Sequence, residues 1–352
     1  MEPLTHFLFG GVMARAGLNR TSALATATLV LAAEAADLDV VTELGGHASA
    51  FEHHRGITHT FVGVPGVAAV VVLVLYLWYR GWGRRRWQPG RPPPRWGVLF
   101  ALACLAGLSH ILLDFTNNYG VRPFEPFSCR WYAWDIVFIV EPVLWIILLG
   151  GLLLPSLFGP ARGEAASQLQ GGRPRGRASA LAALLLVCAF WGFRDHQHRR
   201  ALAALEAGAY GGEKPVRVSA YPYYVNPFRW HGVVETRDFY DSKTVNSRLA
   251  QVGAGDGAWL RPKPEQTAPV LAAERSQVGR AYLSWAQYPI IETGRMGQPA
   301  PGYLVRFYDV RFLYPEFRGR RTLGAWVQLN SQLDVTAQDF GMHDDPAQPK
   351  DH

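Results

Sequence analysis

The chain has 352 residues, 49% of them hydrophobic and 18% charged, with a net charge of +7 that comes almost entirely from arginine. This composition excludes a disordered chain, a collagen-like repeat and a disulfide-stapled scaffold, and the length predicts at least two regions. A mean hydropathy of zero does not exclude a membrane protein, because an apolar half and a polar half would average to it.

Six segments before residue 194 are apolar enough for helices in or at a membrane. Two weaker segments rich in small residues come first, then three long ones and a shorter one: residues 4–18, 21–36, 61–79, 96–115, 136–158 and 178–193. A bilayer core about 30 Å thick needs roughly 20 helical residues, which the long segments supply. We therefore predict an α-helical integral membrane domain of about six helices over residues 1–193.

Arginines occupy the loops at one end of these segments. They fill the linkers at residues 80–95 and 160–177, and Arg15 and Arg20 flank the first turn. Basic loops stay in the cytoplasm, so six crossings place both termini and the loops at 37–60 and 116–134 outside. No aromatic interleaving or nucleic-acid motif accompanies the arginines, so we expect no nucleic-acid partner.

The chain becomes polar after residue 193 and rich in Tyr, Trp, Val, Pro and Gly from about residue 216. We predict a helical linker over residues 194–209, a small β-rich extracytoplasmic domain over 210–340, and a disordered tail over 341–352. Imperfect alternation of apolar and polar residues, which is typical of strands, marks four segments of the β-rich domain. They are residues 230–236, 281–285, 303–314 and 323–335.

Ionisable side chains in membrane segments are costly and usually functional. In the predicted topology nearly all of them lie near the outer ends of the segments, whereas chance would scatter them over both ends. They are His6, Asp37, Asp39, His53, His54, His59, His110, Asp114, Asp135 and Glu141. The sequence therefore predicts one functional site at the outer membrane interface.

The spacing of these residues favours a metal site. His110 and Asp114 are four residues apart, so both lie on one helix face and reach one ion. Imidazole with carboxylate and no thiolate suits a divalent metal, Zn²⁺ first with Mn²⁺ or Fe²⁺ as alternatives, or a two-metal site. Such an ion lowers the pKa of bound water to about 7, which predicts a hydrolase. The other candidate ligands bracket a Gly-containing turn or end a helix: His54, His59, Asp37 and Asp39.

Five short motifs stand in chain order: PLTH at 3–6, DLD at 37–39, HRGITHT at 54–60, HILLD at 110–114, and 116–120 followed by PF at 123–124. Together they resemble the YdjM-like, LexA-linked family of inner-membrane metal-dependent hydrolases over about residues 1–158. The resemblance implies a bacterial inner-membrane protein related in pattern to zinc-dependent phospholipase C-like proteins. By position it implies six metal ligands: His6, Asp39, His54, His59, His110 and Asp114. Asp37 is a further candidate. Family members often have Pro where Ala36 stands.

We expect metal-bound hydroxide to attack an ester, with a phosphoester of a membrane lipid or envelope precursor as first candidate because a headgroup would lie beside the site. Arg55 is the candidate for neutralising a phosphate, and Asp135 or Glu141 for proton transfer or for orienting a ligand histidine. Two alternatives stay open: a non-catalytic metal-binding protein of envelope stress or scaffolding, and an ion or proton pathway. The sequence names no protein partner.

Overall fold

The structure is a computed structural model that describes residues 1–46, 49, 51, 54–87, 92–157, 176–253, 259–297, 301–314 and 323–341. The chain divides into a first unit, Met1–Asp39 with Arg55–Asp195, and a second unit, Val40–His54 with His196–His352. The predicted boundary at residue 193 falls inside one continuous helix, α8. Of the tail predicted over residues 341–352, only residue 341 is among the described residues. His53 also lies outside them.

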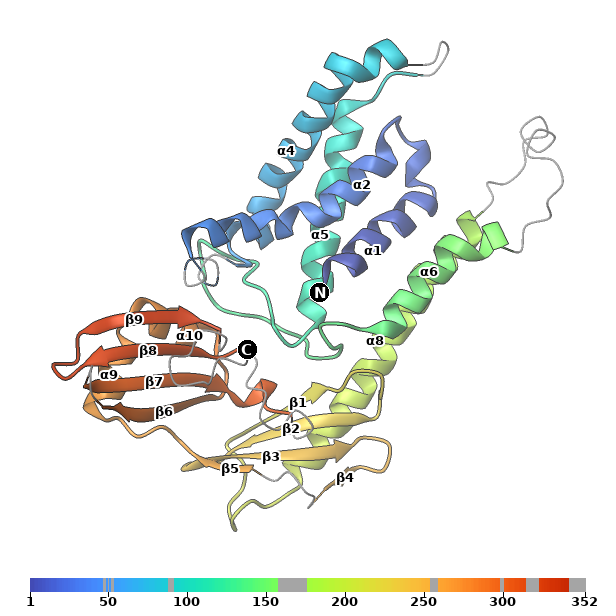
Figure 1. The fold of residues 1–352 in the computed structure, drawn as a ribbon. Helices are drawn as coiled ribbons and strands as arrows, with labels where there is room; N and C mark the ends of the chain where they lie inside the picture. The colour runs from blue at the N-terminus through green and yellow to red at the C-terminus, as the bar shows by residue number, and fades with distance from the viewer. Residues whose placement is uncertain are drawn as a thin grey trace. The chain divides into compact units, whose positions relative to one another are not determined.

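The first unit is helical (Figure 1). Its α-helices are α1 (Pro3–Arg15), α2 (Ala25–Glu34), α4 (Gly63–Trp78), α5 (Trp96–Thr116), α6 (Pro142–Leu157) and the first part of α8 (Arg177–Glu206). Short 3₁₀ or π helices lie between them: η1 (Leu18–Arg20), η2 (Ala35–Gly45), η3 (Ile57–His59), η4 (Tyr79–Gly83) and η5 (Arg84–Arg86).

Three helices are long and apolar enough to cross a membrane: Gly63–Gly83, Trp96–Thr116 and Arg177–Glu206. A shorter apolar helix covers Pro142–Pro155, while α1 and α2 have only 13 and 10 residues. The predicted helical membrane region is therefore confirmed at this level. The number of six crossings stays a prediction.

Small residues let the helices of the first unit approach closely, as in other membrane bundles. A Cβ added to Gly10 of α1 would lie 2.9 Å from the carbonyl oxygen of Leu29 in α2. Likewise, a Cβ on Gly151 of α6 would lie 2.5 Å from the Cβ of Ala183 in α8. The side chains of α1, α2, α4 and α5 form one buried cluster, and those of α1, α6 and α8 form another.

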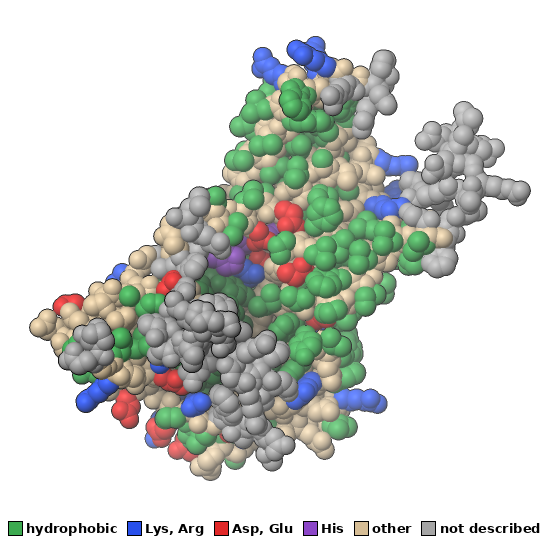
Figure 2. Space-filling view, in the orientation of Figure 1, with side chains coloured by type: hydrophobic (Ala, Val, Ile, Leu, Met, Phe, Trp, Pro, Cys, Tyr) green, Lys and Arg blue, Asp and Glu red, His purple; other side chains and the backbone are tan. Residues whose placement is uncertain are grey.

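The arginines at the end of α1 and at the starts of α5 and α8 lie toward one end of the first unit, and the candidate ligands lie toward the other. Arg177 at the start of α8 donates its Nε–H to the carbonyl oxygen of Ala16, at 3.1 Å, so two basic ends meet there. Arg95 precedes α5, and α5 leads from it toward Asp114, while α1 leads from His6 toward the basic end. In Figure 2 a histidine patch (purple) lies among acidic side chains (red), away from the basic tips (blue) of the helices.

The second unit holds two antiparallel sheets. The first has the order β1-β2-β3-β4 with β5 paired to β3, and the second has the order β6-β7-β8-β9. The strands are β1 (Arg217–Pro222), β2 (Arg229–Glu235), β3 (Phe239–Asn246), β4 (Gln251–Val252), β5 (Trp259–Pro262), β6 (Pro289–Met296), β7 (Gly302–Asp309), β8 (Ala325–Asn330) and β9 (Val335–Phe340). The predicted β-rich region is confirmed in this form. Two α-helices and a 3₁₀ helix accompany the sheets: α9 (Ala268–Glu274), α10 (Gln277–Trp285) and η6 (Val310–Phe312).

The strand predicted over residues 281–285 is wrong, because this segment is the end of α10. Its apolar residues follow the helical period: Val278, Tyr282 and Trp285 are all buried. The Ser276 hydroxyl accepts a hydrogen bond from the backbone N–H of Gly279 at 3.0 Å and caps the helix. Five residues alone are too few to display this period.

Replacing the cap, Ser276→Ala, is expected to destabilise the second unit by about 1 kcal/mol, because a backbone N–H of the first turn loses its acceptor. Thermal unfolding of the full chain measures the change. Ser284→Ala is the matched control, since Ser284 is exposed on the same helix and its hydroxyl donates to the carbonyl oxygen of Ala281. Equal effects of the two substitutions would contradict the capping role.

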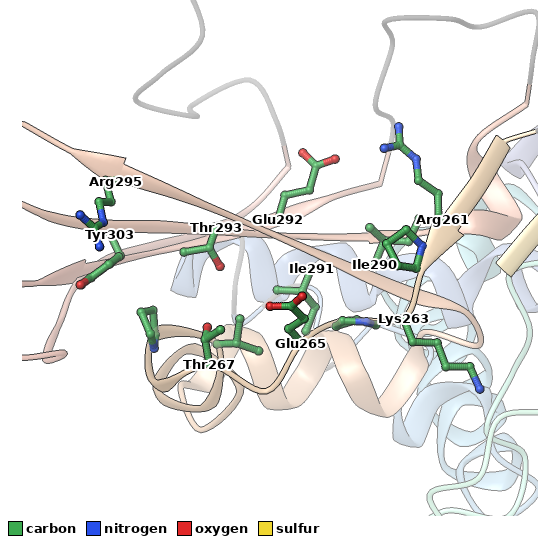
Figure 3. Close-up of a pocket in the computed structure, with 14 residues that line it drawn as sticks. Arg261, Lys263, Glu265, Thr267, Ile290, Ile291, Glu292, Thr293, Arg295 and Tyr303 are labelled. Atoms are coloured by element: carbon green, nitrogen blue, oxygen red, sulfur yellow. The ribbon is translucent and has the colours of Figure 1, made fainter. Parts of the chain in front are cut away.

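A groove of about 540 Å³ lies in the second unit, between β5, the segment that follows it, α9 and β6. Figure 3 shows Arg295 and Tyr303 at one end and Arg261 and Lys263 at the other. Glu292 also lines the groove, so acidic and basic groups are mixed and the groove has no charge of one sign. Its chemistry differs from the histidine and aspartate site predicted from the sequence.

Candidate metal centre

Four of the predicted residues come together in the first unit: Asp37, His59, His110 and Asp114. Asp37 lies on η2, His59 ends η3, and the other two lie four residues apart near the end of α5. One ligand atom from each lies within 4.8 Å of every other. The side chains of His59, His110 and Asp114 are fully buried, and that of Asp37 is 21% exposed.

The distances within this group, which we call the four-residue cluster, fit a four-coordinate ion. The Nε2 atoms of His59 and His110 are 3.0 Å apart, and they lie 3.3 and 3.4 Å from Asp37 Oδ1. Both lie 3.5 Å from Asp114 Oδ2. Ligand atoms bound tetrahedrally to zinc at 2.0–2.1 Å are about 3.3 Å apart. Asp114 Oδ2 has no hydrogen-bond partner, which a coordinating ion would supply.

The protonation of His110 is set by the backbone. Its Nδ1 is 2.6 Å from the carbonyl oxygen of Ala33, which only accepts hydrogen bonds, so Nδ1 carries the proton. The lone pair of Nε2 therefore points into the cluster, as a metal ligand requires. A cation between this atom and the facing Nε2 of His59 would satisfy both lone pairs.

On its other side, His59 contacts Thr58 and Asp39. Its Nδ1 is 3.0 Å from Thr58 Oγ1 and 3.5 Å from Asp39 Oδ2, and the same Asp39 oxygen accepts the backbone N–H of Arg55 at 2.8 Å. The structure therefore places Asp37 in the four-residue cluster and Asp39 behind the histidine, where a carboxylate orients the ring.

Asp39→Ala is expected to weaken metal binding roughly 10- to 100-fold without abolishing it, because His59 loses its orienting carboxylate. Competition against a chromogenic chelator measures the affinity, and Asp37→Ala provides the comparison. A smaller loss for Asp37→Ala than for Asp39→Ala would reverse the roles given to the two carboxylates.

The side chain of Arg55 holds Asp114 in place. Its guanidinium is buried and donates to Asp114 Oδ1 at 2.9 Å and to the carbonyl oxygen of Gly120 at 2.7 Å. It also lies 4.7 Å from the centre of the Tyr119 ring. Gly120 has φ +88°, which lets the turn after α5 present that carbonyl. The amino group of Met1 contacts Asp114 Oδ1 as well.

The remaining predicted residues lie around or away from the cluster. His6 stacks on His110, with ring centroids 3.8 Å apart, and its Nε2 is 3.5 Å from Asp114 Oδ1. His54 belongs by its contacts to the second unit. Glu141 interacts with the backbone of Val143 and the charge of Arg194. Asp135 has a positive φ of 58° just before the segment that leads to α6.

Comparison with known proteins decides the family. The family described as YdjM inner membrane protein matches residues 1–200. The chain belongs to this family. A curated relative, the uncharacterized protein YfhP of Bacillus subtilis (strain 168), is 28% identical over 121 residues, which are 34% of this chain and 33% of that protein. The chain thus spans about a third of the length of that relative. No solved structure matches.

The range matched by the YdjM family contains the whole four-residue cluster and ends inside α8. The family thus accounts for the helical part of the chain and for its place in an inner membrane. The two sheets of the second unit lie beyond the matched range.

Proposed function

We propose that this YdjM family protein is a membrane-bound metal-dependent hydrolase that cleaves a phosphoester of a lipid or envelope precursor at the outer face of the bacterial inner membrane. The observation that carries the proposal is the buried cluster of two histidines and two aspartates, whose ligand atoms lie 3.0–3.5 Å apart in five of six pairs. The membrane-length helices beside it support a substrate in the membrane.

A divalent ion at this cluster, Zn²⁺ first with Mn²⁺ or Fe²⁺ as alternatives, would act as a Lewis acid and lower the pKa of bound water. The chain supplies the geometry. Arg55 and Asp39 hold Asp114 and His59 in place, and Asp37 is the one partly exposed member of the cluster. Substrate and water would therefore approach past Asp37. Asp135 and Glu141 are proposed for proton transfer or for support of the site.

An apolar surface beside the cluster favours an amphiphilic substrate. Ile57, Phe61 and Phe127 are 54%, 48% and 83% exposed. The backbone N–H of Phe61 donates to the carbonyl oxygen of Pro123, which ties this surface to the loop after α5. Such exposed apolar patches mark membrane or ligand contacts. Because Arg15, Arg95 and Arg177 lie toward the other end of the unit, the positive-inside rule supports an outer site and an extracytoplasmic second unit.

One observation favours a second function, that of a non-catalytic metal-binding membrane protein. Three of the four ligand side chains are fully buried, as in structural metal sites that leave no position for a substrate. In that case the ion would hold η2, η3 and α5 together.

Turnover separates the two functions. Full-length protein in lipid nanodiscs, loaded with Zn²⁺, is expected to release headgroup or phosphate from members of a panel of phospholipids, lipid diphosphates and phosphodiesters. His110→Ala and Asp114→Asn proteins are expected to release none. Stoichiometric bound metal without turnover across the panel would reject the hydrolase and support the structural role.

A further inference from the structure

His6 is a buried histidine that the four-residue cluster does not use. Its side chain is fully buried, and neither Nδ1 nor Nε2 has a hydrogen-bond partner. Buried polar atoms almost always have partners, and leaving one without costs about 1–3 kcal/mol. A neutral imidazole carries one N–H and one lone pair, so the nitrogen with the lone pair, if it is Nε2 beside the Asp114 carboxylate, can bind a cation.

The stacking of His6 on His110 excludes one ion shared by both rings. The two rings are nearly parallel, at 17° with centroids 3.8 Å apart. A metal binds an imidazole in the plane of the ring, about 2 Å from the nitrogen. An ion in the plane of His110 would therefore lie well out of the plane of His6. His59, by contrast, crosses His110 at 67° with the two Nε2 atoms 3.0 Å apart, so one ion can lie close to both nitrogens.

Asp114 faces both histidine planes with different oxygens. Its Oδ2 lies 3.5 Å from the Nε2 atoms of His59 and His110, and its Oδ1 lies 3.5 Å from His6 Nε2. A carboxylate placed in this way bridges two cations. In two-metal sites the ions are about 3.5–4 Å apart, which is close to the 3.8 Å between the stacked rings.

Two further oxygens lie in the same region without a hydrogen-bond partner. They are Asp37 Oδ2, whose other oxygen belongs to the cluster, and Glu34 Oε1. Glu34 ends α2 and Asp37 lies three residues later on η2, so the two side chains share one helix face. Both are buried oxygens of the type that a hard divalent cation prefers.

We propose that the cluster binds a second divalent cation, held by His6 Nε2 and Asp114 Oδ1, with Asp114 as the bridge and Asp37 and Glu34 as further oxygen ligands. This inference rests on the proposed function, because it adds a second ion to the metal site proposed for the hydrolase. Each carboxylate oxygen accepts at about two positions, so Asp114 Oδ1 would bind the cation and keep its hydrogen bond from Arg55, and the long contact from Asn117 Nδ2, at 3.5 Å, would be lost. The cation would displace the amino group of Met1, which contacts the same oxygen.

Metal content and spin coupling test this proposal on the full-length protein in detergent, without an affinity tag of histidines. Protein saturated with Mn²⁺ and then desalted is expected to hold two ions per chain and to give the spectrum of an exchange-coupled pair by electron paramagnetic resonance. His6→Gln is expected to hold one ion and to give an uncoupled six-line spectrum. Glu34→Gln should weaken only the second ion. His196→Gln is the control, because His196 is exposed on α8.

One ion per chain in the native protein, or two coupled ions in the His6→Gln protein, would overturn the proposal. Retention of one ion by the His6→Gln protein also reports that the four-residue cluster is folded; if this variant does not fold, the native stoichiometry and Glu34→Gln decide. Turnover measurements on the same protein test the proposed hydrolase activity independently of the second cation. Two coupled ions without turnover would reject hydrolysis alone, and one ion with turnover would reject the second cation alone.

Discussion

His110→Ala is expected to remove bound metal from the protein, with affinity at least about 100-fold lower than that of the native chain. His110 contributes its Nε2 to three of the short distances of the cluster, and the carbonyl oxygen of Ala33 fixes its proton on the other nitrogen. Loss of an orienting partner alone costs 10- to 100-fold in affinity, so loss of a ligand should exceed that range. Metal analysis of purified protein after dialysis measures the effect.

Two further variants distinguish loss of a metal ligand from a change in side-chain size and from loss of a histidine elsewhere. Asp114→Asn preserves side-chain size and removes the negative charge, and it should lose metal to the same extent. His196→Ala removes an exposed histidine of α8 and should change nothing. Full metal retention by both cluster variants would exclude the site.

Gly63→Ala is expected to destabilise the first unit by about 3 kcal/mol, at the upper end for overpacking, and to weaken metal binding with it. A Cβ at Gly63 would lie 1.7 Å from the carbonyl oxygen of Ile57 and 3.0 Å from Thr60 Oγ1. The backbone of η3 would have to move, and η3 ends at His59. Thermal unfolding and chelator competition on the same preparation record the two effects.

Gly66→Ala on the same helix is the matched control. A Cβ at Gly66 meets no atom within 4 Å, so alanine should leave metal binding unchanged and add up to about 1 kcal/mol through helix propensity. If both substitutions behaved alike, helix propensity rather than the contact with η3 would explain the Gly63 result.

The spacing of apolar and ionisable residues is enough to predict most of the site. His110 and Asp114 share a helix face because they are four residues apart, and α5 keeps this relation. The sequence predicts His6, Asp37 and His59 at one depth, because the alternation of apolar segments and arginine loops fixes which end of each helix they occupy. In the structure Asp37 and His59 lie in the four-residue cluster, and His6 lies beside Asp114.

Other features depend on contacts that no local pattern contains. The resemblance implies Asp39 as a ligand and Asp37 only as a further candidate. In the structure η2 is a 3₁₀ helix, which turns Asp37 toward the cluster and Asp39 toward His59 Nδ1 and the backbone N–H of Arg55. The resemblance implies His54 as a ligand, whereas its contacts group it with the second unit. The sequence suggests Arg55 as the residue that neutralises a phosphate. In the structure its guanidinium is buried and donates a hydrogen bond to Asp114.

By itself, the sequence determined the membrane-helical first part, the β-rich second part, and the set of polar residues from which a site can be built. Hydropathy and charge decide these features, because burying a charge in an apolar segment is costly wherever it occurs. Only the tertiary structure decided which atoms meet. That choice follows from ring planes, such as the stacking of His6 on His110, and from backbone contacts, such as Gly63 against Ile57, which arise only when distant segments pack.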